Sequence, residues 1–145
     1  MKVVAALCVL FLLASCSTGP ETGSIVRSTA SKSAGFSPRA DGLYVGGDEG
    51  GSRSFLRFYD DHTVVEAGVT TNATPADVRR WLTKTSDKEI SRGTWSPNGK
   101  FTVTSAEGDV DYTVTGQRDD GYTLSTHSKI NGHDDSTTVT FSPDS

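Results

Sequence analysis

The chain has 145 residues, a formal net charge of −4 and 34% hydrophobic residues. This mild acidity, with no basic cluster longer than Arg79-Arg80, argues against nucleic acid as a partner and against electrostatic membrane binding. The two cysteines, Cys8 and Cys16, lie near the N-terminus, so the rest of the chain must fold without a disulfide.

An apolar run follows a short basic start at the N-terminus. After Met1 and Lys2, residues 3–14 contain only Val, Ala, Leu, Cys and Phe. This run of 12 residues ends close to the helix-breaking sequence "STGP". It is shorter than the ~20 apolar residues that a membrane-spanning helix needs. We interpret residues 1–15 as a secretory signal peptide.

The motif "LASC" at residues 13–16 ends this apolar run. It matches the lipobox at all four positions, so the N-terminus resembles that of bacterial lipoprotein precursors. The resemblance implies that the Cys16 thiol is alkylated with diacylglycerol and that cleavage leaves Cys16 as the first residue. A lipidated Cys16 would anchor the chain to a membrane of the cell envelope, and Ser17 implies the outer membrane if the organism has one. The alternative is an ordinary signal peptide followed by a free cysteine.

The segment after the lipobox has the composition of a linker. Ser, Thr, Gly and Pro dominate residues 17–38, where no apolar period appears. This composition predicts a flexible tether over residues 16–38, with Phe36 as its one candidate contact with the domain. Residues 39–145 have the length of one domain with a single core.

The first part of the predicted domain contains strand patterns. A short strand is expected at residues 43–45, followed by a flexible loop at "GGDEGGS" (46–52). Residues 55–59 and 63–69 have the pattern of two hairpin arms, with "DDH" (60–62) at the tip.

One segment has a helical pattern instead. The sequence "TPAD" (74–77) supplies a capping hydroxyl, a proline at the first helical position and an acid three residues after the cap. Val78, Trp81 and Leu82 then share one face. We expect a helix of roughly ten residues that lays Trp81 over the open end of a barrel.

The C-terminal half has a regular strand-and-turn pattern. Five alternating segments between residues 91 and 141 are separated by turn signals at 97–99, 107–108, 119–121 and 131–132. Short turns make successive strands antiparallel. The predicted fold is mainly β: a small antiparallel up-and-down barrel, or a strongly curled sheet, of about eight strands with one short helix.

The order of these motifs also resembles known proteins. The barrel is similar to that of lipocalins. The succession of "RFYDDHTV", "TPADVRRWL" and "INGHDDSTTVTF" resembles a class of small uncharacterised bacterial lipoproteins. That resemblance spans residues 55–141 and rests on turn and core residues, so it implies a fold and no chemistry.

The polar residues provide no pattern typical of a metal site. His62, His127 and His133 lack the spacing of metal ligands. The acidic pairs at 60–61, 119–120 and 134–135 do not match a calcium-binding EF-hand loop. We interpret these pairs as solvated hairpin tips and predict no metal and no cofactor.

Catalytic patterns are absent from the sequence as well. No Gly-x-Ser-x-Gly motif occurs. Glu66, Glu107 and Asp111 are the candidates for the carboxylate pair of a glycosidase, but strand alternation turns Asp111 outward. We predict a protein that is not an enzyme.

Three binding functions fit this pattern. The first is a lipid-anchored module that contacts another envelope protein. The second is a lipocalin-like carrier of a small apolar ligand, with Trp81, Trp95, Tyr112 and Tyr122 as the binding residues. The third is an inhibitor of an envelope hydrolase that uses the loops around Asp60, Asp119 and Asp134.

Overall fold

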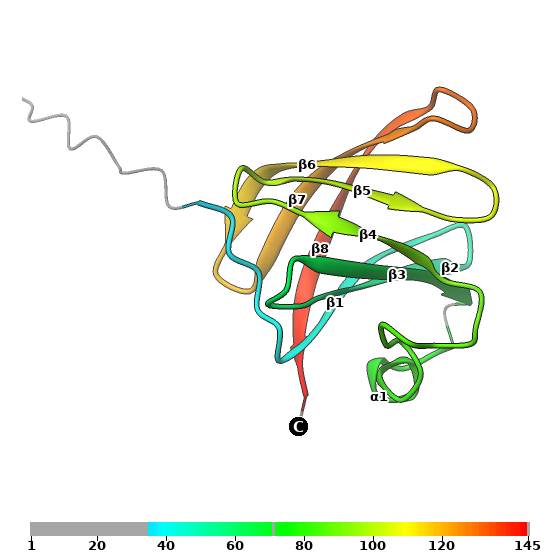
Figure 1. Ribbon diagram of the computed structural model, residues 1–145. Coiled ribbons are helices and arrows are strands. Elements are labelled where there is room, and N and C mark those ends of the chain that lie inside the picture. The colour runs from blue at the N-terminus through cyan, green and yellow to red at the C-terminus, as the bar shows by residue number, and fades with distance from the viewer. Residues whose placement is uncertain (1–34, 71, 145) are drawn as a thin grey trace, which may run out of the picture. The chain divides into compact units, whose positions relative to one another are not determined.

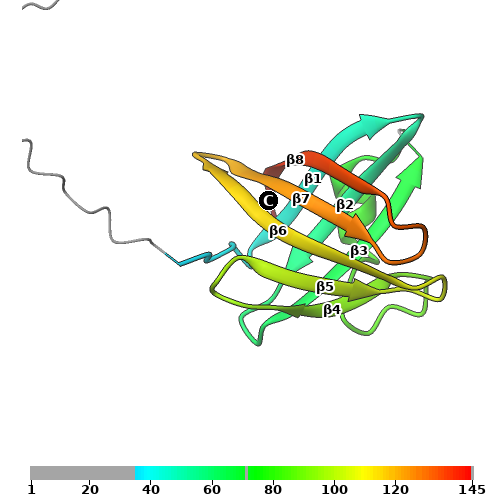
Figure 2. The ribbon, with the colours of Figure 1, turned by 90° about the horizontal axis from the view of Figure 1, so that it is seen from above.

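The computed structural model describes residues 35–70 and 72–144, which form an antiparallel β-barrel (Figures 1 and 2). Each strand pairs with the next one along the chain, and the last pairs with the first, which closes the barrel. The strands are β1 (Gly42–Glu49), β2 (Ser52–Phe58), β3 (Thr63–Thr70), β4 (Ser91–Trp95), β5 (Lys100–Thr104), β6 (Asp109–Arg118), β7 (Gly121–Ser128) and β8 (Asp134–Pro143). The prediction of a small, mainly β barrel is confirmed, and the barrel is closed.

The meander and the first hairpin lie where the sequence predicted them, but two loop predictions were wrong. The expected loop at 46–52 instead continues β1 to Glu49 and turns at Gly50 and Gly51, which have φ values of 61° and 83°. Only glycine adopts such a backbone readily, so these two residues make a tight turn. Asp134 and Asp135 begin β8 rather than forming a hairpin tip.

Aromatic side chains fill one half of the barrel interior. Phe36, which precedes the barrel, is buried among the rings of Phe58, Trp95, Phe101 and Tyr122, at centroid distances of 5.0 to 6.3 Å. Its backbone N–H donates to the carbonyl of Pro97 at 2.8 Å. The chain therefore packs into the barrel from Phe36 onward, three residues before the domain start expected at residue 39.

A second apolar cluster lies outside the barrel, on β1, β2 and β3. Neighbouring residues of these strands are buried on opposite faces, as with Phe55 outside and Leu56 inside. The outer cluster consists of Leu43, Phe55, Val65, Ala67, Val78, Leu82 and Ile90. Strands with two apolar faces need a cover on the outside as well as a core within.

Helix α1 (Pro75–Arg79) provides part of this cover; it packs on the outside of the barrel against β1 and lies below the strands in Figure 1. The capping box is formed as predicted, with the backbone N–H of Asp77 donating to the Thr74 hydroxyl at 3.2 Å. The expected ten-residue length and the position over the barrel end were both wrong. After Arg79 the helix gives way to turns, where the backbone N–H groups of Trp81 and Leu82 both donate to the carbonyl of Val78, at 3.1 and 2.8 Å. It packs on the outer cluster because that apolar surface lies on the barrel wall.

The two ends of the barrel differ in how they are closed. The β2–β3, β4–β5 and β6–β7 turns lie at one end, together with the segment around Phe36. At this closed end the Tyr44 hydroxyl accepts from the backbone of Arg39 at 2.9 Å, and the Tyr122 hydroxyl donates to the carbonyl of Ser37 at 3.3 Å. The β1–β2, β5–β6 and β7–β8 turns surround the other, open end.

An ion-pair clamp joins the barrel, the helix and the last described residue. Asp144 contacts Arg57 of β2 at 2.7 Å and Arg79 of α1 at 2.5 Å. Arg79 also donates to the carbonyl of Pro143 at 2.6 Å. One carboxylate thus serves two guanidinium groups whose side chains are only 17% and 20% exposed.

Asp144→Asn should lower the free energy of unfolding by about 1 to 2 kcal/mol, because it leaves two half-buried cations without their anion. Urea denaturation measures the loss. The matched control is Asp41→Asn, whose partner Arg39 is well exposed and whose loss should cause no measurable change. Equal stability of the two variants would contradict a structural role for the clamp.

Candidate functional site

A polar cavity occupies the open half of the barrel. We call it the cup; its volume is about 260 Å³. Its walls come from strands β1, β2, β3, β6, β7 and β8. The lining residues are Gly47, Ser52, Ser54, Glu66, Gly68, Tyr112, Thr126, Asp135 and Thr137.

Strand alternation places these side chains inside the barrel. Ser52 and Ser54 share a face of β2 with the buried Leu56, and Glu66 and Gly68 share a face of β3 with the buried Val64. The inner faces of β2 and β3 are therefore apolar toward the closed end and polar or small toward the open end.

A cross-strand row runs along one wall of the cup. Tyr112 of β6 lies opposite Thr126 of β7, which in turn lies opposite Asp135 of β8. Residues that face each other across neighbouring strands have adjacent side chains. The row therefore leads from the buried Tyr112 to the exposed Asp135 at the rim.

One hydrogen bond spans the barrel and forms the floor of the cup. The Tyr112 hydroxyl donates to Glu66 Oε1 at 2.6 Å, and it joins strands that are three places apart in the ring. Below it, the Tyr112 ring stacks on Phe101 with centroids 4.7 Å apart. Tyr112 therefore separates the aromatic half of the interior from the polar half.

The floor carboxylate lies in an unusual electrostatic environment. Protein atoms enclose most of Glu66, which opens to solvent through the cup. Burial raises the pKa of this carboxyl, and the hydrogen bond from Tyr112 opposes that rise. Burial and the neighbouring Glu66 charge also raise the pKa of the Tyr112 hydroxyl, which keeps it a proton donor at neutral pH.

A second hollow adjoins the cup and is acidic too. It measures about 330 Å³, shares Glu66 and Gly68 with the cup, and includes Glu89 and Glu107 in its lining. None of the residues that line the two hollows is Lys, Arg or His. The lining of these two hollows therefore presents carboxylates and hydroxyls without a basic side chain.

The four aromatic residues expected to bind a ligand separate into three locations. Trp95 and Tyr122 belong to the packed aromatic half, and Tyr112 lies at the cup floor. Trp81 lies outside the barrel, against the outer cluster. The structure thus brings one of the four to the cup. Cys16, the expected lipidation site, lies outside the described residues.

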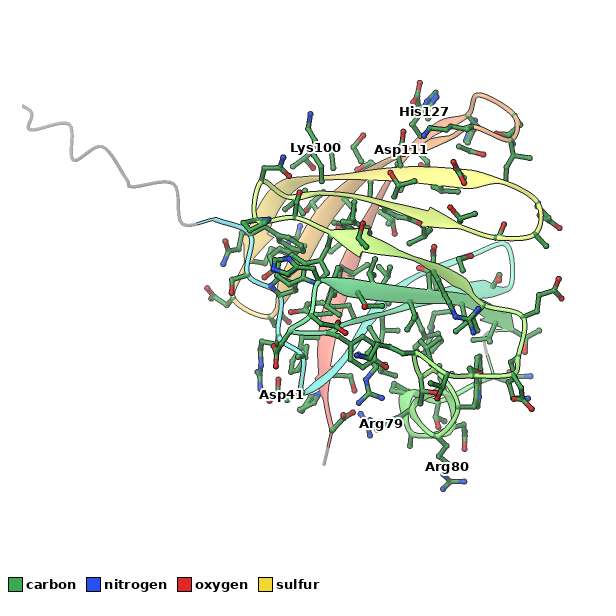
Figure 3. The ribbon with its side chains drawn as sticks, viewed as in Figure 1. Asp41, Arg79, Arg80, Lys100, Asp111 and His127 are labelled. Carbon is green, nitrogen blue, oxygen red and sulfur yellow. The ribbon has the colours of Figure 1, made fainter. Side chains whose placement is uncertain are left out.

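The other polar candidates lie elsewhere. Figure 3 shows Asp111 and His127 on the outside of β6 and β7, where they face each other across the strands. Asp111 accepts from Thr102 at 2.6 Å and pairs with Lys129 at 3.1 Å, while His127 contacts Asp134 at 2.7 Å. Nowhere in residues 35–70 and 72–144 do three or more His, Cys, Asp or Glu side chains gather in a way that could hold a metal ion.

The sequence did not reveal that Glu66 and Asp135 line one cavity. The signal for Glu66 was its position two residues after Val64, which places both on one face of β3. Val65 and Ala67 on the other face are also apolar, so alternation alone does not identify the inner face. Asp135 follows the turn sequence "NGH", and Asp is common both in turns and at the start of a strand. The sequence therefore did not show that Asp135 belongs to a strand.

Comparisons with known proteins add no relative. No protein-family model matches the chain, and searches of curated proteins and of solved structures find no match either. Within the part of the chain that the structure describes, no helix combines the length and the apolar character needed to cross a membrane.

Proposed function

We propose that the chain is a lipoprotein of a bacterial cell envelope, anchored through Cys16, whose barrel is a non-catalytic binding module. The cup is the binding site for a small polar molecule. The observation that carries the proposal is the cup itself, an open cavity of about 260 Å³ with a half-buried carboxylate, hydrogen-bonded to Tyr112, at its floor. A cavity with a few converging polar groups is the usual form of a small-molecule site.

The packing favours a polar ligand over an apolar one. The aromatic half of the interior is filled by its own rings, with the Phe36 side chain inserted among them. The cup is lined by hydroxyls, carboxylates and glycines. An apolar ligand would cover these groups without hydrogen bonds, which is unfavourable.

The alternative is that the barrel binds another protein. Such an interface usually has a cluster of exposed apolar side chains, and the described surface has none. Ile130 is the one large hydrophobic residue exposed among the described residues. The loops proposed for inhibition of a hydrolase do not gather at one place, because Asp60 and Asp119 lie at the closed end and Asp134 begins β8 at the other.

The anchor is tested by Cys16→Ser in the bacterium that produces the protein. The variant has no thiol for diacylglycerol, so the chain should move from the membrane fraction to the soluble fraction. Cys8→Ser is the matched control and should remain with the membranes. A Cys16→Ser chain that still sediments with membranes would contradict lipid anchoring.

Gly68→Leu tests the cup. An added Cβ at Gly68 would lie 3.9 Å from the Ser52 hydroxyl, an ordinary contact, so the longer side chain can extend into the cavity. Native mass spectrometry of the purified chain should show a retained small molecule on the wild type and none on Gly68→Leu. A second Gly→Leu change at Gly51 would strain the backbone, whose φ is 83° there. The control is therefore Ile130→Ala, on the exposed surface, which should retain the molecule as the wild type does. A ligand retained equally by Gly68→Leu would place binding outside the cup.

A further inference from the structure

Within the proposed binding module, on which this inference rests, we propose that the cup selects a small organic cation with a primary ammonium group. The carboxylate of Glu66 would be the main partner of the ammonium group at the floor. Asp135 would add attraction at the rim.

The charges around the cup favour a cation. Glu66 and Asp135 line the cup, and Glu89 and Glu107 line the adjoining hollow. Four carboxylates thus line the two hollows, and no basic side chain lines either of them. An anion would meet only repulsion there, whereas a cation gains from each carboxylate.

The nearest basic side chains are turned away from the cup or occupied elsewhere. Arg53 lies between Ser52 and Ser54 on β2, so it points to the opposite face. Arg92 donates to the carbonyl of Ser86 at 2.7 Å, and Lys129 pairs with Asp111 on the outside of the barrel. No basic side chain therefore neutralises the carboxylates from within the lining of the two hollows.

The hydroxyls of the cup suit the three hydrogens of a primary ammonium group. Such a group needs several acceptor oxygens at once. The Ser52 hydroxyl donates its proton to the carbonyl of Val69 at 3.3 Å, so its lone pairs are available to a ligand. Ser54, Thr126 and Thr137 add further hydroxyl oxygens around the same cavity.

The volume of the cup and the side chains around it disfavour two other kinds of ligand, which are large molecules and divalent metal ions. Drug-sized ligands occupy roughly 300 to 1,000 Å³, so a cavity of about 260 Å³ fits a smaller molecule. A divalent metal is disfavoured, since no group of three or more potential ligands of this kind gathers in the described residues. A compact organic cation meets both conditions.

Binding of the cation should be linked to a proton. The Tyr112 hydroxyl contacts Glu66 directly. The other titratable groups that line a hollow together with Glu66 are Asp135 in the cup, and Glu89 and Glu107 in the adjoining hollow. None of them supplies a positive charge. Burial raises the pKa of the empty carboxyl, and an ammonium group beside it would lower that pKa again. Binding would then release a proton, and affinity would rise with pH.

The test is an NMR titration of the chain from residue 16 onward, carrying Cys16→Ser so that no lipid is attached. The probes are 1-aminobutane, 1-butanol and butyrate, which differ in charge and little in shape. We expect 1-aminobutane to shift the amides of β3, β6 and β8 with an affinity about tenfold or more above that of 1-butanol. Butyrate should cause no shift there.

Glu66→Gln should weaken binding of 1-aminobutane about tenfold or more and remove the rise of affinity with pH. Asp134→Asn is the matched control, since it removes one carboxylate from the residue next to Asp135 but on the outer face, where it contacts His127. Its affinity should equal that of the wild type. Unchanged spectra away from the cup show that each variant is folded.

Equal binding of 1-butanol and 1-aminobutane, or unchanged amine affinity in Glu66→Gln, would overturn the cation selectivity and leave the cup as a binding site. A lack of any shift with all three probes would overturn it too. The proposed binding module is tested separately, by the molecule retained in native mass spectrometry, so the two proposals fail by different results.

Discussion

Phe36→Ala should lower the free energy of unfolding by about 3 to 4 kcal/mol, the usual cost of removing a buried aromatic ring from a packed core. Phe36 is 8% exposed and contacts the rings of Phe58, Trp95 and Tyr122 with centroids 5.0 to 5.6 Å apart. Its loss would open a cavity at the closed end of the barrel. Few single substitutions in a domain of this size cost more.

The measurement is urea denaturation followed by the fluorescence of Trp95, whose ring is in edge contact with Phe36. Ile130→Ala is the control, because Ile130 is 49% exposed and its truncation should change stability little. A chain that starts at residue 39 should be at least as unstable as Phe36→Ala, since it lacks the same ring. Wild-type stability in that shortened chain would show that the segment before residue 39 is not part of the folding unit.

Much of the barrel could be predicted from local patterns. The turns around Pro97, Glu107, Asp120 and Asn131 combine residues that favour tight reversal, and the segments between them alternate. Short turns force antiparallel neighbours, so the order of β4 to β8 follows from the chain itself. Closure is a different matter, because the pairing of β1 with β8 joins residues about a hundred positions apart.

The errors about the barrel wall and the position of the helix share one physical cause, which is that burial on two faces hides the strand period. In β2 and β3 both Phe55 and Leu56, and both Val64 and Val65, are buried. The sequence therefore did not reveal that these strands carry a core inside and another outside. The helix was assigned to the barrel end for the same reason, since the apolar wall that it covers was taken for a single inner face.

The same ambiguity concealed the candidate site. Glu66 looks like a polar residue on an exposed strand face until the inner face of β3 is known. Its partner Tyr112 comes from β6, 46 positions along the chain, and no local pattern relates the two. Tyr112 was identified as a binding residue from its aromatic character, whereas its hydroxyl is what faces the cup floor.

Glu66→Gln should stabilise the ligand-free domain at neutral and higher pH. Folding takes the Glu66 carboxyl out of water, and burial raises its pKa. Above the carboxyl's unfolded pKa, ordinarily about 4.3, the unfolded state holds an ionised Glu66 that the folded state must accommodate against burial. The amide of Gln carries no charge and can still accept the hydrogen bond from Tyr112. The gain should be on the order of 1 to 2 kcal/mol, the scale of relieving a partly buried charge that one hydrogen bond already compensates in part.

The direction with pH follows from the same shift. Between the unfolded-state and folded-state pKa values of Glu66, the folded protein binds more protons than the unfolded one. Wild-type stability therefore falls as pH rises through the interval between these two pKa values. Below the unfolded pKa both states hold the proton, and the two proteins should be equally stable. Denaturation at a series of pH values should therefore give curves that coincide in acid and separate as pH rises. Asp134→Asn, which removes an exposed carboxylate, should follow the wild type throughout. Parallel curves for Glu66→Gln and the wild type would show that the floor of the cup tolerates a carboxylate as readily as an amide, and the electrostatic basis for cation selectivity would be lost.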